Sequence, residues 1–103
     1  MNIIIKTVDF KAKETLQMFI MEKVSKLFNQ SKNIIRANVI LRKEDVNSPE
    51  NKLCEIRLEV PGNDHFVKLK TEVFEKSILQ AVEKLQKILR RNKNRQIARR
   101  TVR

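Results

Sequence analysis

The spacing of apolar residues changes period along this chain, and that change constrains the fold more than any other feature. Between residues 13 and 29 apolar side chains recur every three or four positions, which predicts an amphipathic helix. The same spacing returns after Thr71, which we expect to cap a second helix that runs to about Asn92. Its first turn holds Glu72 and Glu75, where the helix dipole favours acidic side chains.

Four other segments have the composition or the alternation of strands. They are residues 1–8, 35–42, 52–60 and 65–70. The first is short and β-branched, and the next two alternate apolar with polar side chains. Residues 44–51 are polar and rich in turn formers, which predicts a hairpin loop, and a Pro-Gly turn at 61–64 joins the last two strands.

The resulting order is β-α-β-β-β-α, which predicts an α+β fold. The β-α-β step requires a right-handed crossover between two parallel strands, and two antiparallel hairpins then extend the sheet. Each helix has one apolar stripe and the strands have one apolar face, so we expect a four-stranded mixed sheet with both helices on one face. A length of 103 residues fits one domain, which we assign to residues 1–95.

The charge of the chain is strongly positive and unevenly distributed. Lysine and arginine total 23 against 12 acidic residues, which gives a net charge of +11 and indicates a polyanionic partner. Every charged residue after Glu83 is basic. Residues 96–103 form a basic tail that we predict to be disordered unless bound.

Helical spacing gathers part of this charge on single faces. On a wheel of 100° per residue, the basic residues Lys76, Lys84, Lys87 and Arg91 share a sector about 80° wide. In the first helix Lys23 and Lys26 flank the apolar face. Any one of these lysines is adequately explained as a solvated surface side chain. The dense C-terminal cluster favours phosphate contacts instead, because like charges repel unless a polyanion meets them.

Recognition should involve the backbone and shape of a nucleic acid more than its bases. The chain has no Trp or Tyr, and its single glycine excludes a glycine-rich phosphate loop. Phe66 alone is placed to stack on a base, since alternation sets it on the outer sheet face with Lys68 and Lys70. An edge-strand phenylalanine tucked under a loop fits the sequence equally well.

The chain has too few reactive groups for an active site. It has one histidine and one cysteine, His65 and Cys54, which we interpret as a surface imidazole and a small buried thiol. We expect no catalytic residues, metal, cofactor or small-molecule substrate, and so no enzyme. The absence of a secretory signal or a long apolar run predicts a cytoplasmic protein with no membrane partner.

The two helices resemble those of a known family. Phe19-Ile-Met-Glu-Lys-Val-Ser-Lys-Leu27 and Ala81-Val-Glu-Lys-Leu-Gln-Lys-Ile-Leu-Arg-Arg-Asn-Lys93 are similar to segments of the ribosome hibernation promoting factor and ribosome-associated inhibitor A family, also called sigma-factor modulation proteins. The resemblance covers residues 1–95, and the chain resembles the short form, which lacks a second domain. It departs from the family at Glu72–Ile78, where the family often has Asp-Met-Tyr-x-Ala-Ile.

The resemblance implies a fold like that of a double-stranded-RNA-binding domain. It also implies binding to rRNA of the small ribosomal subunit, in the channel used by mRNA and tRNA, and inhibition of translation in stationary or stressed cells. A ribosome dimerisation partner is left open, as are two alternative functions, a sigma-factor-modulating interaction protein and a structural ribosomal protein.

The resemblance carries over Lys23, Lys26, Lys84, Lys87, Arg91 and Lys93 as basic contact positions, and Arg90 lies in the same run. Helical spacing adds Lys76, and the basic C-terminal cluster adds Arg95. The complete set of predicted RNA-binding residues is Lys23, Lys26, Lys76, Lys84, Lys87, Arg90, Arg91, Lys93 and Arg95.

Overall fold

Six elements follow one another in the order that the sequence predicts. They are β1 (Ile3–Val8), α1 (Glu14–Gln30), β2 (Arg36–Lys43), β3 (Lys52–Glu59), β4 (His65–Thr71) and α2 (Phe74–Thr101). The computed structural model describes residues 2–44 and 47–101, and for residues 94–101 it describes the backbone alone. The predicted α+β class and the β-α-β-β-β-α order are confirmed.

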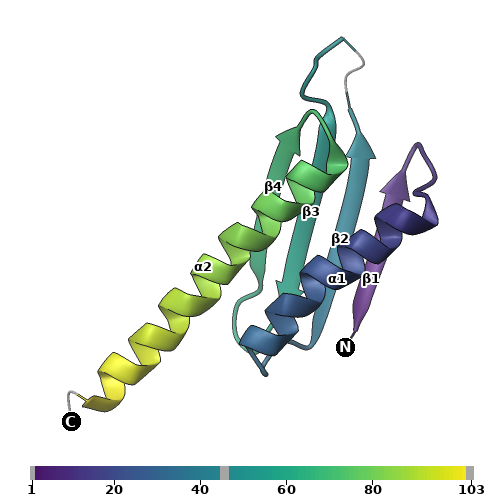
Figure 1. Cartoon of the computed structure of the whole chain (residues 1–103). Coiled ribbons are helices and arrows are strands. Elements are labelled where there is room, and N and C mark those ends of the chain that lie inside the picture. Colours follow the sequence, from purple (N-terminus) through teal and green to yellow (C-terminus); the bar gives the residue numbers. More distant parts are fainter. Residues whose placement is uncertain (1, 45–46, 102–103) are drawn as a thin grey trace.

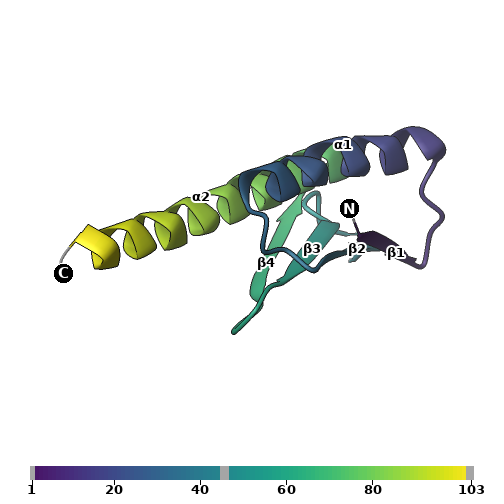
Figure 2. The same ribbon diagram turned by 90° about the horizontal axis from the view of Figure 1, so that it is seen from below.

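The strands form one mixed sheet in the order β1-β2-β3-β4 (Figure 1). β1 and β2 are parallel, with Ile3 opposite Ala37, because helix α1 carries the chain back between them. β2, β3 and β4 are joined by antiparallel pairing. Figure 2 shows both helices on the same side of the sheet, as predicted, so the opposite face has no helical cover.

The core is the apolar layer between the helices and the covered sheet face. Its helical side chains include Ile20, Val24, Leu27, Ile78, Ala81 and Leu85, and its sheet side chains include Ala37, Val39, Leu41, Cys54, Ile56 and Leu58; each of these is 0% exposed. The sheet members alternate along β2 and β3, as a strand with one buried face requires. Each fully buried aliphatic side chain contributes about 1.5–3 kcal/mol relative to an exposed one.

Leu53 departs from this alternation. It is 1% exposed, although it lies on the outer face of β3, because its neighbour Cys54 faces the core. Its register neighbours are Arg42 and Lys70, whose long aliphatic stems can cover an apolar side chain. Lys70 Nζ also pairs with a Glu44 carboxylate oxygen at 3.4 Å, and this ion pair crosses β3. Leu53 is therefore a buried apolar residue that lies outside the main core.

Helix α2 begins two residues later than the sequence predicts. Thr71 is the last residue of β4 and pairs with Lys52, so it cannot serve as the helix cap. The helix starts at Phe74, and the Ser77 amide donates to the Val73 carbonyl at 3.2 Å. The predicted capping role of Thr71 is wrong because its strand pairing continues through that residue.

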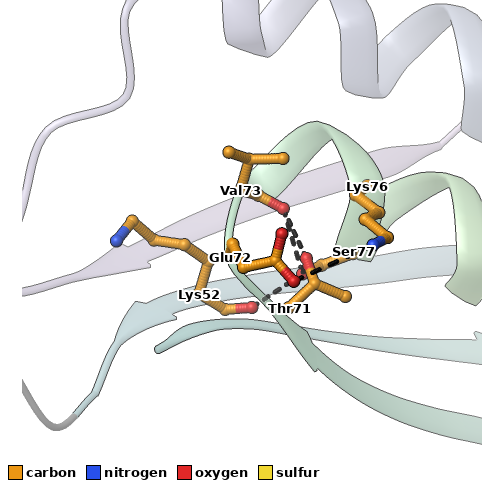
Figure 3. A network of polar contacts seen from close by, with 6 residues as sticks. All are labelled: Lys52, Thr71, Glu72, Val73, Lys76 and Ser77. Atoms are coloured by element: carbon orange, nitrogen blue, oxygen red, sulfur yellow. Dashed lines mark hydrogen bonds and ion pairs between the residues drawn. The ribbon is translucent and has the colours of Figure 1, made fainter. Parts of the chain in front are cut away.

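A buried pair of hydroxyl groups joins the start of α2 to the sheet (Figure 3). Ser77 is 0% exposed, and its Oγ lies 2.7 Å from the Lys52 carbonyl oxygen on β3 and 2.7 Å from Thr71 Oγ1. Thr71 Oγ1 lies 2.7 Å from the Val73 carbonyl oxygen. Two hydroxyl protons serve these three short contacts, so at most two are satisfied at once. The first turn of α2 is thereby held to β3 and β4.

Helix α2 ends at Thr101, nine residues beyond the predicted end at Asn92. Residues 93–101 contain no glycine or proline and consist largely of good helix formers. At 1.5 Å per residue, the 28 residues of α2 span about 42 Å, whereas an eight-residue strand spans about 27 Å. Helix α2 therefore runs past the end of the sheet (Figure 1). The disorder expected for residues 96–103 stays a prediction, and residues 102–103 lie outside the described residues.

Replacing Ser77 with alanine should lower the free energy of unfolding by about 1–3 kcal/mol, because the buried Lys52 carbonyl and Thr71 hydroxyl lose a partner. Urea denaturation followed by circular dichroism measures this loss. The matched control is Ser25→Ala on α1, where an exposed Oγ donates to the Glu22 carbonyl. That change should stay within about 0.5 kcal/mol. Equal losses in the two variants would contradict a role for the buried hydroxyl pair.

Candidate nucleic-acid interface

Helix α2 carries five exposed cations in the second half of the part whose side chains the structure describes. Lys84, Lys87, Arg90, Arg91 and Lys93 are all exposed. Among the described side chains, none of these five cations lies within ion-pair distance of a carboxylate. Lys76 differs, because it pairs with Glu72 one turn earlier, at 3.9 Å (Figure 3). The charge of α2 is thus balanced at its start and unbalanced beyond Glu83.

The spacing of these cations brings like charges onto neighbouring positions of the helix. Lys87 and Arg91 are four residues apart, and Lys84–Lys87, Lys87–Arg90 and Arg90–Lys93 are three apart. Such pairs destabilise a helix by roughly 0.2–0.5 kcal/mol each in the absence of an anion. A phosphate backbone laid along this surface would remove the repulsion and release counterions.

Helix geometry divides the predicted basic residues of α2 between two sides. Lys76, Lys84, Lys87 and Arg91 share one sector of the wheel, and we call this set the α2 stripe. Lys93 is nine residues beyond Lys84, which turns its side chain by about 180°. It lines an open polar hollow at the end of α1, together with Asn29, Ser31 and Lys32. Lys93 therefore lies on a different side of α2 from the stripe.

The two lysines of α1 lie on the side that faces α2. That side is marked by Gln30, whose Nε2 donates to the Gln86 carbonyl oxygen of α2 at 2.8 Å. Lys23 lies two turns before Gln30, and Lys26 lies one turn before it. The Lys23 side chain is only 20% exposed, with Nζ 5.4 Å from the centre of the Phe19 ring and 3.7 Å from a Glu22 carboxylate oxygen. Lys26 is exposed.

The predicted set therefore maps to two surfaces on the helical side of the molecule. The α2 stripe faces away from α1, whereas Lys23, Lys26 and Lys93 lie toward the space where the two helices meet. Arg90 lies outside the stripe sector and is exposed. The side chain of Arg95 lies outside the described residues, so its predicted contact stays a prediction.

The outer face of the sheet has a different charge distribution, which the sequence analysis did not detect. Four of its cations have carboxylate partners, in the pairs Arg36–Glu59, Arg57–Asp64, Lys68–Glu55 and Lys70–Glu44, at 3.3 to 3.9 Å. Two of these pairs join residues that lie opposite each other on neighbouring strands. The register of the sheet was needed to find them. The charge of this face is largely compensated, in contrast to that of α2.

The only cysteine and histidine of the sequence, Cys54 and His65, do not form a common site. Cys54 is buried in the core, and desolvation, with a smaller effect of the Glu55 charge, raises the pKa of its thiol to about 12. His65 is half-buried at the start of β4, where its Nε2 lies 3.2 Å from Asn92 Nδ2 of α2. Across residues 2–44 and 47–101, no three His, Cys, Asp or Glu side chains are grouped to hold a metal ion. No helix in that part is long and apolar enough to span a bilayer.

Comparisons with known proteins give one family and one fold. The family model described as sigma 54 modulation protein / S30EA ribosomal protein matches residues 3–97. The N-terminal domain of Protein Y from Thermus thermophilus is 20% identical with a TM-score of 0.74, covering 88% of this chain and 98% of that one. A ribosomal subunit interface protein from Coxiella burnetii is 16% identical with a TM-score of 0.79, covering 91% and 99%. The comparison with curated proteins gives no match.

The buried thiol of Cys54 should be unreactive in the native protein. Its pKa is raised from 9.0 to about 12, so almost no thiolate forms at pH 8, and Ellman's reagent should label it only when the chain unfolds. One thiol should react at once in guanidinium. Because the folded pKa is the higher one, the stabilisation is complete below pH 9 and is lost as the pH rises toward 12. Rapid labelling of the native protein would contradict this assignment.

Proposed function

The chain belongs to the sigma 54 modulation protein / S30EA ribosomal protein family, and from this premise we propose that it binds ribosomes and inhibits translation. The specific proposal is that it occupies the mRNA and tRNA channel of the small subunit and contacts rRNA there. It thereby silences ribosomes in stationary phase or under stress, as a cytoplasmic hibernation factor. The family, described as a ribosomal protein family, and the structural relative that is a ribosomal subunit interface protein support association with the ribosome.

The observation that carries the RNA-binding part of the proposal is the row of unpaired cations on α2. A cation that already has a carboxylate partner must lose that partner before it can bind a phosphate. The exposed lysines and arginines beyond Glu83 have no such competitor among the described side chains. Each phosphate they neutralise releases counterions and adds affinity without reading sequence.

The proposed contacts involve both helices. The α2 stripe supplies Lys76, Lys84, Lys87 and Arg91, and α1 supplies Lys23 and Lys26. Arg90, Lys93 and Arg95 complete the proposed set. The partial burial of Lys23 against Phe19 fixes the direction of its side chain, so it is the most restricted cation of the group. The exposed cations of α2 can adjust to a backbone whose phosphates are unevenly spaced.

Three neutralising substitutions in the α2 stripe should weaken ribosome binding far more than three elsewhere. The test variant carries Lys84→Gln, Lys87→Gln and Arg91→Gln, and the control, with the same net charge, carries Lys43→Gln, Lys68→Gln and Lys70→Gln. Co-sedimentation with small subunits at several salt concentrations should give at least about ten-fold weaker binding for the stripe variant. Its slope of log K against log salt should fall by about three. The control should remain close to wild type.

Two results would refute this proposal. Equal losses in the two triple variants would mean that bulk charge alone drives binding. Failure of the wild-type protein to sediment with small subunits at low salt would exclude ribosome binding itself. A pull-down that retains RNA polymerase with its sigma factor and no ribosomes would favour the sigma-factor function in the family description.

A further inference from the structure

A hollow of about 220 Å³ lies on the outer face of the sheet. This face is the one opposite the helices (Figure 2). It spans the sheet from Ile4 and Lys6 on β1, across Asn38 of β2 and Arg57 of β3, to Phe66 on β4. These five residues form two adjacent rows of the register, since Ile4, Asn38, Arg57 and Phe66 lie side by side. The proposed ribosomal contacts on the helices do not use this surface.

The exposed aromatic ring is the feature of this hollow that most needs an explanation. Phe66 is 48% exposed on an open sheet face, so the alternative of a ring tucked under a loop is excluded. The Arg57 guanidinium carbon lies 5.3 Å from the centre of the ring, and Arg57 Nη1 lies 3.9 Å from an Asp64 carboxylate oxygen. A fixed pair of planar groups is a surface on which a nucleobase stacks, because bases stack on both aromatic rings and guanidinium planes.

The other walls are apolar, amide and charged side chains. The one carboxylate among the lining residues, that of Glu55, is paired with Lys68 at 3.8 Å. Ile4, which is 36% exposed, and Ile40 supply an apolar floor. The Asn38 side-chain amide donates to Glu59 at 2.7 Å, which leaves its carbonyl oxygen able to accept from an exocyclic amine of a base. Lys6 is exposed at the edge of the hollow and makes no ion pair within the described part of the chain, so it is available to a phosphate.

The size of the hollow limits the ligand that it can hold. At about 220 Å³ it is smaller than the roughly 300 Å³ at which drug-sized ligand sites begin. It therefore accommodates one ring system and its attached phosphate. Lys6 at its edge, unpaired among the described side chains, favours an anionic occupant over a neutral ring.

We propose that this hollow binds one unpaired nucleobase of single-stranded RNA, stacked on the Phe66–Arg57 pair with its phosphate near Lys6. The protein would then contact RNA on two opposite faces, with phosphates along the helices and a base on the sheet. Binding of a base at the sheet face does not depend on the ribosome binding proposed above, because any flexible single strand of RNA presents an unpaired base.

The test is titration of the whole protein with a short single-stranded oligoribonucleotide, followed by two-dimensional amide NMR and by fluorescence anisotropy. Amide shifts should appear on all four strands that line the hollow, β1 to β4. Phe66→Leu, which keeps an apolar side chain and removes the ring, should weaken single-strand binding at least about five-fold. Arg57→Lys, which keeps the charge and removes the planar group, should weaken it by a smaller factor. Met18→Ala, at a 64% exposed apolar site on α1, is the control and should change nothing.

Duplex RNA of the same sequence separates this site from the helical one. Phe66→Leu should leave duplex binding and ribosome co-sedimentation unchanged, whereas the α2 stripe variant should lose both. Equal single-strand affinities for wild type and Phe66→Leu would overturn the proposal, as would amide shifts confined to the helices. Shifts on the sheet face caused by RNA-free ribosomal proteins and not by the oligonucleotide would assign this face to a protein partner and would also overturn it.

Discussion

The apolar layer between one face of the sheet and the two helices is the interaction on which the rest of the structure depends. Ile20 and Leu27 of α1 and Ile78 and Leu85 of α2 are completely removed from water there. Because the chain forms only this one layer, the outer face of the sheet and the far sides of both helices stay exposed. The core thus decides which surfaces are available, and the distribution of charge decides what each surface can bind.

The sheet face and helix α2 differ in how far their positive charge is balanced by carboxylates. On the sheet, neighbouring strands place carboxylates opposite or near cations, and four ion pairs compensate the face. On α2 no acidic residue follows Glu83, so the cations beyond Lys87, which lies four residues after Glu83, have only other cations as charged neighbours along the helix. This repulsion is tolerated because the first half of α2 is anchored by Phe74, Ile78 and Leu85. An anion that binds the native helix therefore also stabilises the fold.

Periodicity was enough to predict the order of elements, the one-sided cover and most of the core, because burial on a single face imposes a period that the sequence must follow. It failed where a local contact overrides the period. Thr71 has the side chain of a cap but is held in β4 by pairing with Lys52. Leu53 lies on the outer face yet is 1% exposed, with Arg42 and Lys70 as its neighbours on the adjacent strands. Among candidate site residues, the wheel found the α2 stripe, whereas cross-strand neutralisation and the hollow beside Phe66 depend on register, which no single segment encodes.

The rigidity of the two surfaces bears on how they would bind RNA. The α2 stripe is carried by a helix whose first turn is fixed to the sheet by Ser77, so the positions of its cations along the axis are set before any ligand arrives. Phe66 is likewise held on a paired strand, with Arg57 already against its ring. Preorganised groups lose little conformational freedom on binding, so more of each contact is retained as affinity. A stripe that follows phosphates and a fixed ring on the opposite face together suit a protein placed between two segments of RNA.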